Sequence, residues 1–599
     1  MRQSFDETTD PSYGPRHLPL IRRAMADQGL DGFIVPHEDE HQNEYLPAAN
    51  DRLAWATGFT GSAGAAMIMT DKAALFVDGR YALQAPAQVD QDMFEIKDLM
   101  DGGVPAWIEA TAKAGQVLGY DPRLHSPDSL ARLEAAAVKA GASMIAMSDN
   151  PLDAAWGANR PAQPAAPVVP HPLQYSGEAS AEKRRRIGLA MNADAAVLTA
   201  PASIAWLFNI RGGDVIRSPL PLGQAILRKD GSADLFLDPA KITPGLAKWL
   251  DADVALHDPS DLQGALAKLS NQIVSIDPAQ SSAWYFSQLE TAGARIYRMP
   301  DPTALPRAIK NAVEIAGARA AHSRDGAALT NFLHWIATQN GPIEELAAVA
   351  QLEAFREATG VLKDLSFDTI AGAGPNGAIV HYHPTLKNSR AAQDGDLLLV
   401  DSGGQYLDGT TDVTRTVSIG TPSEEMRQRF TLVLKGHLAL ARVHFPAGIT
   451  GSSLDALARG PLWAQGLDYD HGTGHGVGSY LGVHEGPQGI SKRAGGAPLQ
   501  PGMIVSNEPG YYKTGAYGIR IENLQVVTQP TQIAGGERAM LGFETLTLAP
   551  IDRKLIAVPL LTAEERAQLD AYHAGVLAEI GPQLGADASA WLEQVCAPL

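Results

Sequence analysis

The chain has 599 residues, of which 45% are hydrophobic, and a formal net charge of −19 at pH 7. This length exceeds what one hydrophobic core supports, so we expect several domains. The acidity argues against a nucleic-acid-binding protein, and no apolar run approaches the roughly 18 residues of a membrane span, which argues against a membrane protein.

The first block, residues 1–160, alternates strand-like and helical segments. Apolar runs predict strands at 32–36, 65–70 and 73–77, followed by a turn at 78–81 (D-G-R-Y). The block ends in a proline- and alanine-rich stretch that is typical of a linker. The pattern favours an α/β domain.

The second block, residues 175–305, repeats features of the first. Residues 204–212 (I-A-W-L-F-N-I-R-G) match 53–61 (L-A-W-A-T-G-F-T-G) at Ala-Trp and at the final Gly. The apolar strands 31–36 and 194–199 precede these segments in the two blocks. A repeat of about 150 residues predicts domain duplication rather than a solenoid.

The third block, residues 306–599, opens with helices. The first carries an apolar face at i, i+3, i+4 and i+7, formed by Leu329, Phe332, Leu333 and Ile336. A second helical stretch covers 343–359. A final helix near 562–580 opens with T-A-E-E, the pattern of a capping box.

Five residues of the third block form a hard, oxygen-rich ligand set: Asp401, Asp412, His475, Glu508 and Glu522. The acids lie in apolar, glycine-flanked runs typical of buried strands, where a carboxylate needs a partner. A single Asp beside Gly is usually a turn residue, and an ion pair to Arg520 explains one acid but not four. Four carboxylates converge only if cations compensate them, so the set predicts a two-metal site on a sheet.

Histidines gather around the same region. The segment 471–478 (H-G-T-G-H-G-V-G) holds His471 and His475, and His484 follows. Its glycines permit close backbone approach to a ligand. His381 and His383 form another pair. For His383 and His471 a hydrogen bond to a metal ligand, or a purely structural one, is the alternative, and for His383 we favour that alternative.

Several strings in this order resemble aminopeptidase P, the Xaa-Pro aminopeptidase family of pita-bread metallopeptidases. They are 399–403 (L-V-D-S-G), 409–416 (G-T-T-D-V-T-R-T), 471–478, 508–512 (E-P-G-Y-Y) and 518–523 (G-I-R-I-E-N). The likeness is greatest to the three-domain cytosolic type and extends over nearly the whole chain, including 78–81 and 205–212.

The resemblance implies a mixed α/β (α+β) fold. Two creatinase-like N-terminal α/β domains, 1–160 and its duplicate 175–305, would precede a pita-bread catalytic domain at 306–599.

The resemblance also implies residue roles. Metal ligands would be Asp401, Asp412, His475, Glu508 and Glu522, with Asp412 and Glu522 bridging both ions. Catalytic residues would be His381, His471, His484 and Glu508. Substrate-binding residues would be Arg80, His381, His475, His484 and Arg520. The resemblance also implies two divalent cations as cofactors. The hardness of the ligands and the resemblance favour Mn²⁺, with Co²⁺ or Zn²⁺ as alternatives.

Two positions depart from the family pattern. Ser506-Asn507 precedes Glu508 where Thr-Asp is common, and we expect little effect because the glutamate is retained. His383 stands where Ala is common, and it could modify the pocket edge or acquire a stray metal.

The implied reaction is hydrolysis. Paired cations lower the pKa of a shared water, which attacks the scissile carbonyl. Glu508 is the candidate proton shuttle, and His381 or His484 would stabilise the oxyanion.

Two other interpretations of the same ligand set remain. One is a prolidase, which cleaves Xaa-Pro dipeptides, and the other is a non-catalytic pita-bread protein that binds peptides or proteins. The duplicated N-terminal half favours the aminopeptidase over prolidase and over methionine aminopeptidase. Binders typically have degraded ligand positions, and creatinase-like relatives lack the metal set, whereas all five positions are intact here.

The expected partners are peptides with a penultimate proline, whose free α-amino group suits an acidic protein, and the resemblance implies a homodimer. One cysteine, Cys596, excludes an internal disulfide. Together with an N-terminus that lacks the apolar segment of a secretory signal, it predicts a cytoplasmic location.

Overall fold

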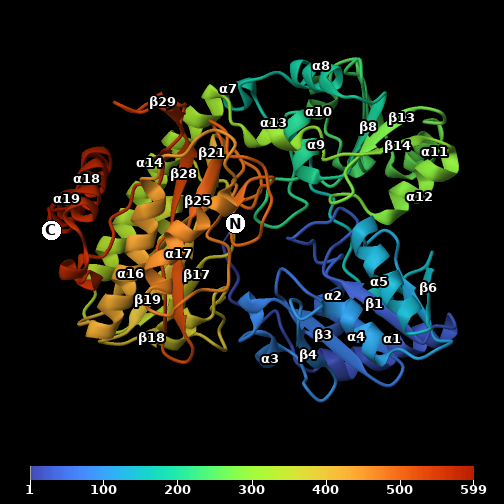
Figure 1. The fold of residues 1–599 in the computed structure, drawn as a ribbon, viewed down its shortest axis with the longest axis horizontal. Helices are drawn as coiled ribbons and strands as arrows, with labels where there is room; N and C mark the ends of the chain where they lie inside the picture. Colours follow the sequence, from blue (N-terminus) through green and yellow to red (C-terminus); the bar gives the residue numbers. More distant parts are fainter. Residues whose placement is uncertain (1) are drawn as a thin grey trace. The chain divides into compact units, whose positions relative to one another are not determined.

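The computed structural model describes residues 2–599, which form two compact units (Figure 1). One unit comprises 8–173 and 178–304. The other comprises 305–599 with the short segments 2–7 and 174–177. Among the described residues, every helix is too short or too polar to cross a membrane.

The first domain of the N-terminal unit is a six-stranded sheet covered on both faces. Its strand order is β4 (Glu95–Asp98), β3 (Ala73–Val77), β2 (Ala65–Met69), β1 (Gly32–Pro36), β5 (Val117–Tyr120) and β6 (Ser143–Ala146). Strand β2 runs antiparallel to both neighbours, and the other pairs are parallel. Such an α/β arrangement buries both sheet faces, which explains the continuous apolar runs of the sequence.

Alternation along β1 divides the core of this domain. Phe33 and Val35 pack with helices α1 (Tyr13–Asp27) and α2 (Arg52–Thr57). Ile34 points to the other face, against α4 (Gly103–Thr111) and α5 (Pro127–Lys139). Short helices α3 (Ala85–Gln88) and α6 (Pro151–Trp156) complete the domain.

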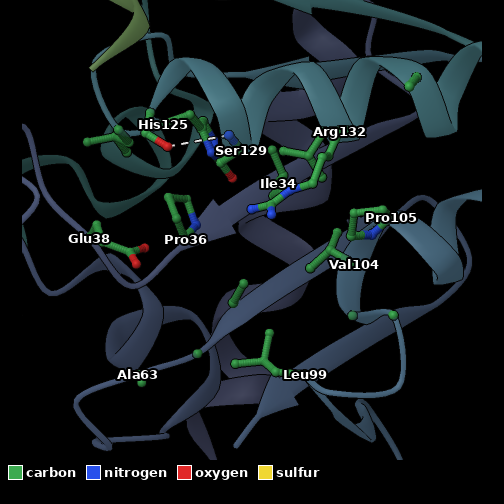
Figure 2. Close-up of a pocket in the computed structure, with 18 of the residues that line it drawn as sticks. Ile34, Pro36, Glu38, Ala63, Leu99, Val104, Pro105, His125, Ser129 and Arg132 are labelled. Atoms are coloured by element: carbon green, nitrogen blue, oxygen red, sulfur yellow. Dashed lines mark hydrogen bonds between the residues drawn. The ribbon is translucent and has the colours of Figure 1, made fainter. Parts of the chain in front are cut away.

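A cavity of about 680 Å³ opens where the strand order reverses between β1 and β5. Its apolar lining includes Ile34, Val104 and Leu133, and the exposed side chains of Glu38 and Arg132 lie on opposite sides of it (Figure 2). Within residues 2–599, the converging metal-ligand atoms lie elsewhere, in the C-terminal unit.

The second domain repeats this topology. Its sheet order is β12 (Val254–His257), β11 (Ala233–Phe236), β10 (Gln224–Arg228), β8 (Ala195–Leu198), β13 (Ile273–Ile276) and β14 (Arg295–Arg298). Strand β10, like β2, is antiparallel to both neighbours. The Ala-Trp segments of the sequence repeat form α2 and α9 (Pro201–Leu207), the helix that follows the central strand of each sheet.

The other elements of the second domain are short. They are β7 (Val169–Pro170), α8 (Ser180–Ala190), β9 (Ile210–Arg211), α10 (Pro244–Trp249), α11 (Leu262–Ala267) and α12 (Ala283–Ala292). Helix α7 (Leu173–Ser176) lies almost entirely in the segment 174–177, which belongs to the other unit.

The C-terminal unit is built on two three-stranded antiparallel sheets. One has the order β17 (Ile370–Ala373), β19 (Leu397–Ser402) and β22 (Val413–Ser418); the other has β25 (Ile504–Asn507), β28 (Asn523–Val527) and β31 (Phe543–Thr545). A hairpin of β26 (Gly510–Lys513) and β27 (Tyr517–Arg520) continues from the second sheet.

Helices surround these strands (Figure 1). They are α13 (Ala304–Ala308), α14 (Ala312–Thr338), α15 (Glu345–Glu357), α16 (Glu424–Ala441), α17 (Asp455–Trp463), α18 (Ala563–Ile580) and α19 (Ala586–Val595). Two-residue to three-residue strands complete the unit: β15 (Ile343–Glu344), β16 (Asp364–Leu365), β18 (Ala391–Ala392), β20 (Gly404–Tyr406), β21 (Gly409–Thr410), β23 (Gly474–His475), β24 (Gly489–Ile490), β29 (Thr531–Gln532) and β30 (Ala539–Met540).

Strand β19 separates the core from the side that carries the predicted ligands. Leu398 and Val400 point into a cluster formed by α14 and α15, which contains the predicted apolar face of α14. Because side chains alternate along a strand, Asp401 lies with Leu397 and Leu399 on the opposite face. The packing of two helices on one face thus fixes where the aspartate points.

The α/β fold class is confirmed, and three local details differ from expectation. Helix α15 begins at Glu345 because the preceding two residues pair with β18. Helix α19 lies in a stretch for which no element was predicted. Glu522 was expected on a strand but occupies the two-residue gap between β27 and β28.

Candidate metal centre

Asp401 lies in strand β19, and Asp412 immediately precedes β22, the antiparallel neighbour of β19. Asp401 in β19 lies opposite Thr414 in β22. Asp412 is two residues before Thr414, so the period of a strand places its side chain on the same face. The sequence between them turns back through β20 and β21, as its glycines predicted.

The two glutamates lie where a pair of long strands is interrupted. Glu508 follows β25, and Glu522 precedes β28, the partner of β25. The backbone N–H of Glu508 donates to Thr473 O at 2.8 Å, and that of Glu522 to Thr414 O at 3.2 Å. Each glutamate is therefore turned out of its own ladder and tied to a segment that carries another candidate ligand.

His475 reaches the cluster on a glycine-rich strand. An added Cβ at Gly474 would lie 2.0 Å from Ser506 O, and one at Gly476 would lie 2.0 Å from Glu485 O. Only glycine allows the backbone to pass this closely on both sides of His475. The N–H of His475 also donates to Ser506 Oγ at 2.9 Å, which couples it to the strand of Glu508.

These residues converge. Ligand atoms of Asp412, His475 and Glu522 all lie within 4.8 Å of one another. His475 Nε2 is 3.4 Å from Asp412 Oδ2 and 3.5 Å from Glu508 Oε1. Asp412 and Glu522 are only 4% and 2% exposed, so their charges are taken out of water.

Asp401 joins the cluster through Arg520. The Arg520 guanidinium donates from Nη2 to Asp401 Oδ2 at 2.6 Å and from Nη1 to Tyr512 Oη at 2.6 Å. The other oxygen of Asp401, Oδ1, is buried and accepts no hydrogen bond from the described residues. This oxygen is available to a cation on the side away from Arg520.

Crowding of carboxylates dominates the electrostatics. Burial, followed by the charges of Asp412 and Asp401, raises the pKa of Glu522 well above its usual range. Burial raises the pKa of Asp401 to about 6, with Arg520 opposing the shift and Asp412 adding to it. Burial raises the pKa of Glu508 as well. The cluster is short of positive charge.

The same environment disfavours the charged form of the acids but favours the charged form of His475. Burial lowers its pKa, but the hydrogen bond to Asp412 and the charge of Glu508 outweigh burial and raise the pKa to about 9. A proton on His475 thus supplies part of the missing positive charge at neutral pH.

The donor set fits hard divalent cations. Carboxylate oxygens and one imidazole are ligands for such ions, and the unsatisfied Asp401 oxygen and the raised carboxyl pKa values are features that a cation removes. The predicted ligand set is therefore chemically suited to the metal ions that the sequence implied.

A surrounding layer of polar contacts orients the candidate ligands. Thr414 Oγ1 donates to Glu522 Oε2 at 2.8 Å, and Ser506 Oγ donates to Glu508 Oε1 at 3.1 Å. Ser506 retains the hydroxyl of the threonine expected at this position, and that hydroxyl contacts Glu508 directly. Sequence reasoning gave no role to either hydroxyl, although both lie within two residues of a predicted ligand.

Arg415 is a second feature that the sequence did not single out. Its buried guanidinium donates to the backbone oxygen of Glu522 at 2.7 Å and to Asn523 Oδ1 at 2.8 Å. It also donates to Ala549 O and Tyr572 Oη. Arg415 thus fixes the backbone of the two-residue interruption between β27 and β28 in which Glu522 lies.

The predicted histidines lie around the cluster at different depths. His471 Nε2 is 2.9 Å from Tyr512 Oη, and its Nδ1 is 3.9 Å from Glu508 Oε2. The exposed ring of His484 packs edge-on against His475, with centroids 4.3 Å apart.

The other two histidines lie on the loop after β17. His381 is half-buried, and the oxygen of the preceding residue, Val380, accepts from Arg520 Nη1 at 3.4 Å. His383 is exposed, and its backbone oxygen accepts from Asn388 Nδ2 at 3.1 Å.

Arg80 belongs to the other compact unit. There it forms two-point contacts with Asp78, with Nη2 at 2.7 Å from Oδ2, and its Nη1 lies 3.9 Å from Glu44 Oε1. These contacts fix the guanidinium on the predicted turn, which forms a 3₁₀ helix at Gly79–Tyr81.

Comparisons with known proteins agree with this architecture. Residues 316–529 match metallopeptidase family M24, and 539–599 match the C-terminal region of that family. Residues 18–150 and 159–314 each match a creatinase/prolidase N-terminal domain.

Relatives of full length are also found. Probable Xaa-Pro aminopeptidases P of Neurospora crassa and Aspergillus niger are each 40% identical over 95% of this chain, covering 86% and 95% of those proteins. The crystal structure of X-prolyl aminopeptidase from Caenorhabditis elegans, described as a cytosolic enzyme with a dinuclear active site, matches with a TM-score of 0.93 and 31% identity. It covers 98% of this chain and all of that one.

A Xaa-Pro dipeptidase from Bacillus anthracis shares the fold over only 62% of this chain, with 24% identity and a TM-score of 0.50. The chain belongs to metallopeptidase family M24 and, within it, to the Xaa-Pro aminopeptidase P relatives.

Metal uptake should release protons. At pH 7 the metal-free protein holds a proton on His475, whose pKa is about 9, and ligation needs the neutral imidazole. Raising the pH removes this competing proton, so apparent Mn²⁺ affinity should rise between about pH 6 and pH 9 and then level off. Titration calorimetry in buffers of different ionisation enthalpy measures the protons released. A pH-independent affinity without proton release would contradict this assignment.

Proposed function

We propose that this member of metallopeptidase family M24 is an aminopeptidase that releases the N-terminal residue from peptides with proline in second position. The observation that carries the proposal is the convergence of Asp412, His475, Glu508 and Glu522, with Asp401 held beside them by Arg520, in a chain whose likeness to Xaa-Pro aminopeptidases extends over its full length. Two divalent ions, most suitably Mn²⁺, complete the site.

Each candidate ligand then has a position. Asp401 would hold one ion through its unsatisfied oxygen, and His475 and Glu508 would hold the other. Asp412 and Glu522 would be shared by both ions, which agrees with their place beside His475 in the tightest part of the cluster. When bound, such ions lower the pKa of water and polarise a carbonyl group.

The chain's own residues position the substrate and move the proton. The acids attract the free α-amino group, which restricts cleavage to the N-terminal end. Glu508 carries a proton towards the leaving proline nitrogen, and its carboxylate is aimed by Ser506 Oγ. His381 and His484 donate hydrogen bonds to the carbonyl oxygen as charge develops on it. His471 is placed between Tyr512 and Glu508, where it orients the glutamate.

The remaining assignments concern organisation. We propose the division 1–160, 175–305 and 306–599, supported by two sheets of identical topology before the catalytic unit. The relative described as cytosolic supports a cytoplasmic location. Assembly as a homodimer is also proposed, and analytical ultracentrifugation tests it.

Hydrolysis of two substrates tests the proposed activity. Arg-Pro-Pro should lose its first residue when Mn²⁺ is present, and a Xaa-Pro dipeptide should be cleaved far more slowly. A preference for the dipeptide would make the protein a prolidase. A protein that contains no metal and stays inert with added Mn²⁺ would instead be a binding protein of the same fold.

Removal of a bridging acid should abolish turnover. Asp412→Ala and Glu522→Ala each delete a group shared by both ions, so we expect kcat to fall by about three orders of magnitude or more even at saturating Mn²⁺. Glu544→Gln, which breaks an exposed ion pair with Arg319, is the control and should retain wild-type rates. Normal kcat in either bridging variant would refute the ligand assignment.

Arg80→Ala should weaken peptide binding and leave the metal centre intact. Its guanidinium is held by Asp78, so the variant removes a fixed cation from the proposed substrate path. We expect KM for Arg-Pro-Pro to rise about tenfold with unchanged metal content. Arg132→Ala, at an exposed arginine of the same domain, is the matched control. An unchanged KM in Arg80→Ala would remove Arg80 from substrate binding.

A further inference from the structure

A buried ion cluster lies directly behind His484. Glu485, the next residue, is 5% exposed, and its Oε1 lies 2.5 Å from Lys310 Nζ. Its Oε2 lies 3.2 Å from Arg307 Nε. Lys310 and Arg307 are 3% and 8% exposed. Three charged side chains are thus withdrawn from water. Their burial is unfavourable unless the attraction between opposite charges offsets the loss of hydration.

The lysine end of this cluster is tied to the strand that leads to Glu508. The N–H of Lys310 donates to Gly502 O at 3.0 Å, and the preceding residue, Ile309, forms a bridge with Met503. Strand β25 starts at the next residue and ends immediately before Glu508. Lys310 therefore moves with one of the candidate ligand strands.

The glutamate end is tied to the segment that carries His475. The N–H of Glu485 donates to Gly476 O at 2.8 Å, and the N–H of Gly476 donates to Gln488 O at 3.2 Å. These bonds close the loop 476–488 onto the residue after His475. His484 lies on this loop, with its ring 4.3 Å from the ring of His475.

The ion pair thus joins two parts of the site that lie far apart in the chain. On one side is the strand of Glu508, and on the other is the loop of His484. The pair does not touch the candidate ligands itself. It contacts the loop at the residue next to His484, whose exposed ring lies against His475.

We propose that Glu485 is a positioning residue, and that its ion pair with Lys310 holds the loop 476–488 so that His484 faces the reacting carbonyl. The inference rests on the proposed function, because it takes His484 as the group that acts on substrate. Lys310 and Glu485 hold no metal and transfer no proton; they act through His484.

Lys310→Met tests the proposal with little risk to the fold, because Glu485 keeps Arg307 as a partner and the remaining pair is neutral. We expect kcat for Arg-Pro-Pro to fall about 10- to 100-fold, with KM and metal content unchanged. Lys310→Arg, which keeps the charge, should recover most of the rate. Glu485→Gln, of the same shape, should reproduce the loss.

Lys435→Met is the matched control. Lys435 pairs with Glu565 at 2.6 Å in a largely buried contact between α16 and α18. It should lower the melting temperature about as much as Lys310→Met and leave kcat unchanged. Hydrogen exchange of the loop 476–488 should accelerate in Lys310→Met alone. An equal loss of kcat in Lys310→Met and Lys435→Met would overturn the proposal, because it would show that the ion cluster only stabilises the fold in general.

A double-mutant cycle with His484→Ala decides whether the effect passes through His484. In that background Lys310→Met should cost less than about twofold in kcat. A full additional loss would overturn the inference while leaving His484 as a catalytic residue. Wild-type kcat in His484→Ala alone would also overturn it, since no group would need positioning. Neither result touches the proposed function, which the substrate comparison tests separately.

Discussion

Mutual repulsion of four crowded carboxylates, three of them buried and that of Glu508 half-buried, is the constraint on which the site is built. Arg520 and a protonated His475 are the cationic groups in direct contact with them, so the cluster remains short of positive charge. Carboxylates in this situation take up protons or bind cations. The raised pKa values of Asp401 and Glu522 describe the first outcome, and a pair of divalent ions is the second.

The fold sustains this repulsion by tying three of the four acids to different elements. Asp401 is held by Arg520 of β27, Glu522 by Thr414 of β22, and Glu508 by Ser506 of β25. Each of these bonds reaches a residue that lies on a paired strand. Arg415 adds a buried cation behind Glu522 and bonds to backbone oxygens, so it stabilises the strand gap as well as the charge.

The sequence predicted those elements that depend mainly on residues close together in the chain. Strand β3 occupies its predicted residues, and Thr562 and Glu565 form the predicted capping box. The position of Glu522 could not be predicted in this way. Its segment alternates like one strand, but β27 pairs with β26 and β28 pairs with β25, and the change of partner leaves Glu522 in the gap. The Lys310–Glu485 contact joins residues 175 positions apart, and neither residue lies in a motif that signals the other.

The arrangement also explains why the ligand set can exist before the ions arrive. Strand pairing places Asp401, the start of β22 places Asp412, and the gaps after β25 and before β28 place the glutamates. Glycines at 474 and 476 let His475 pass between them. Because this backbone is fixed by its own hydrogen bonds, bound ions would mainly offset the charge repulsion. Only the groups on loops, above all His484, depend on separate anchors, because no strand pairing sets their direction.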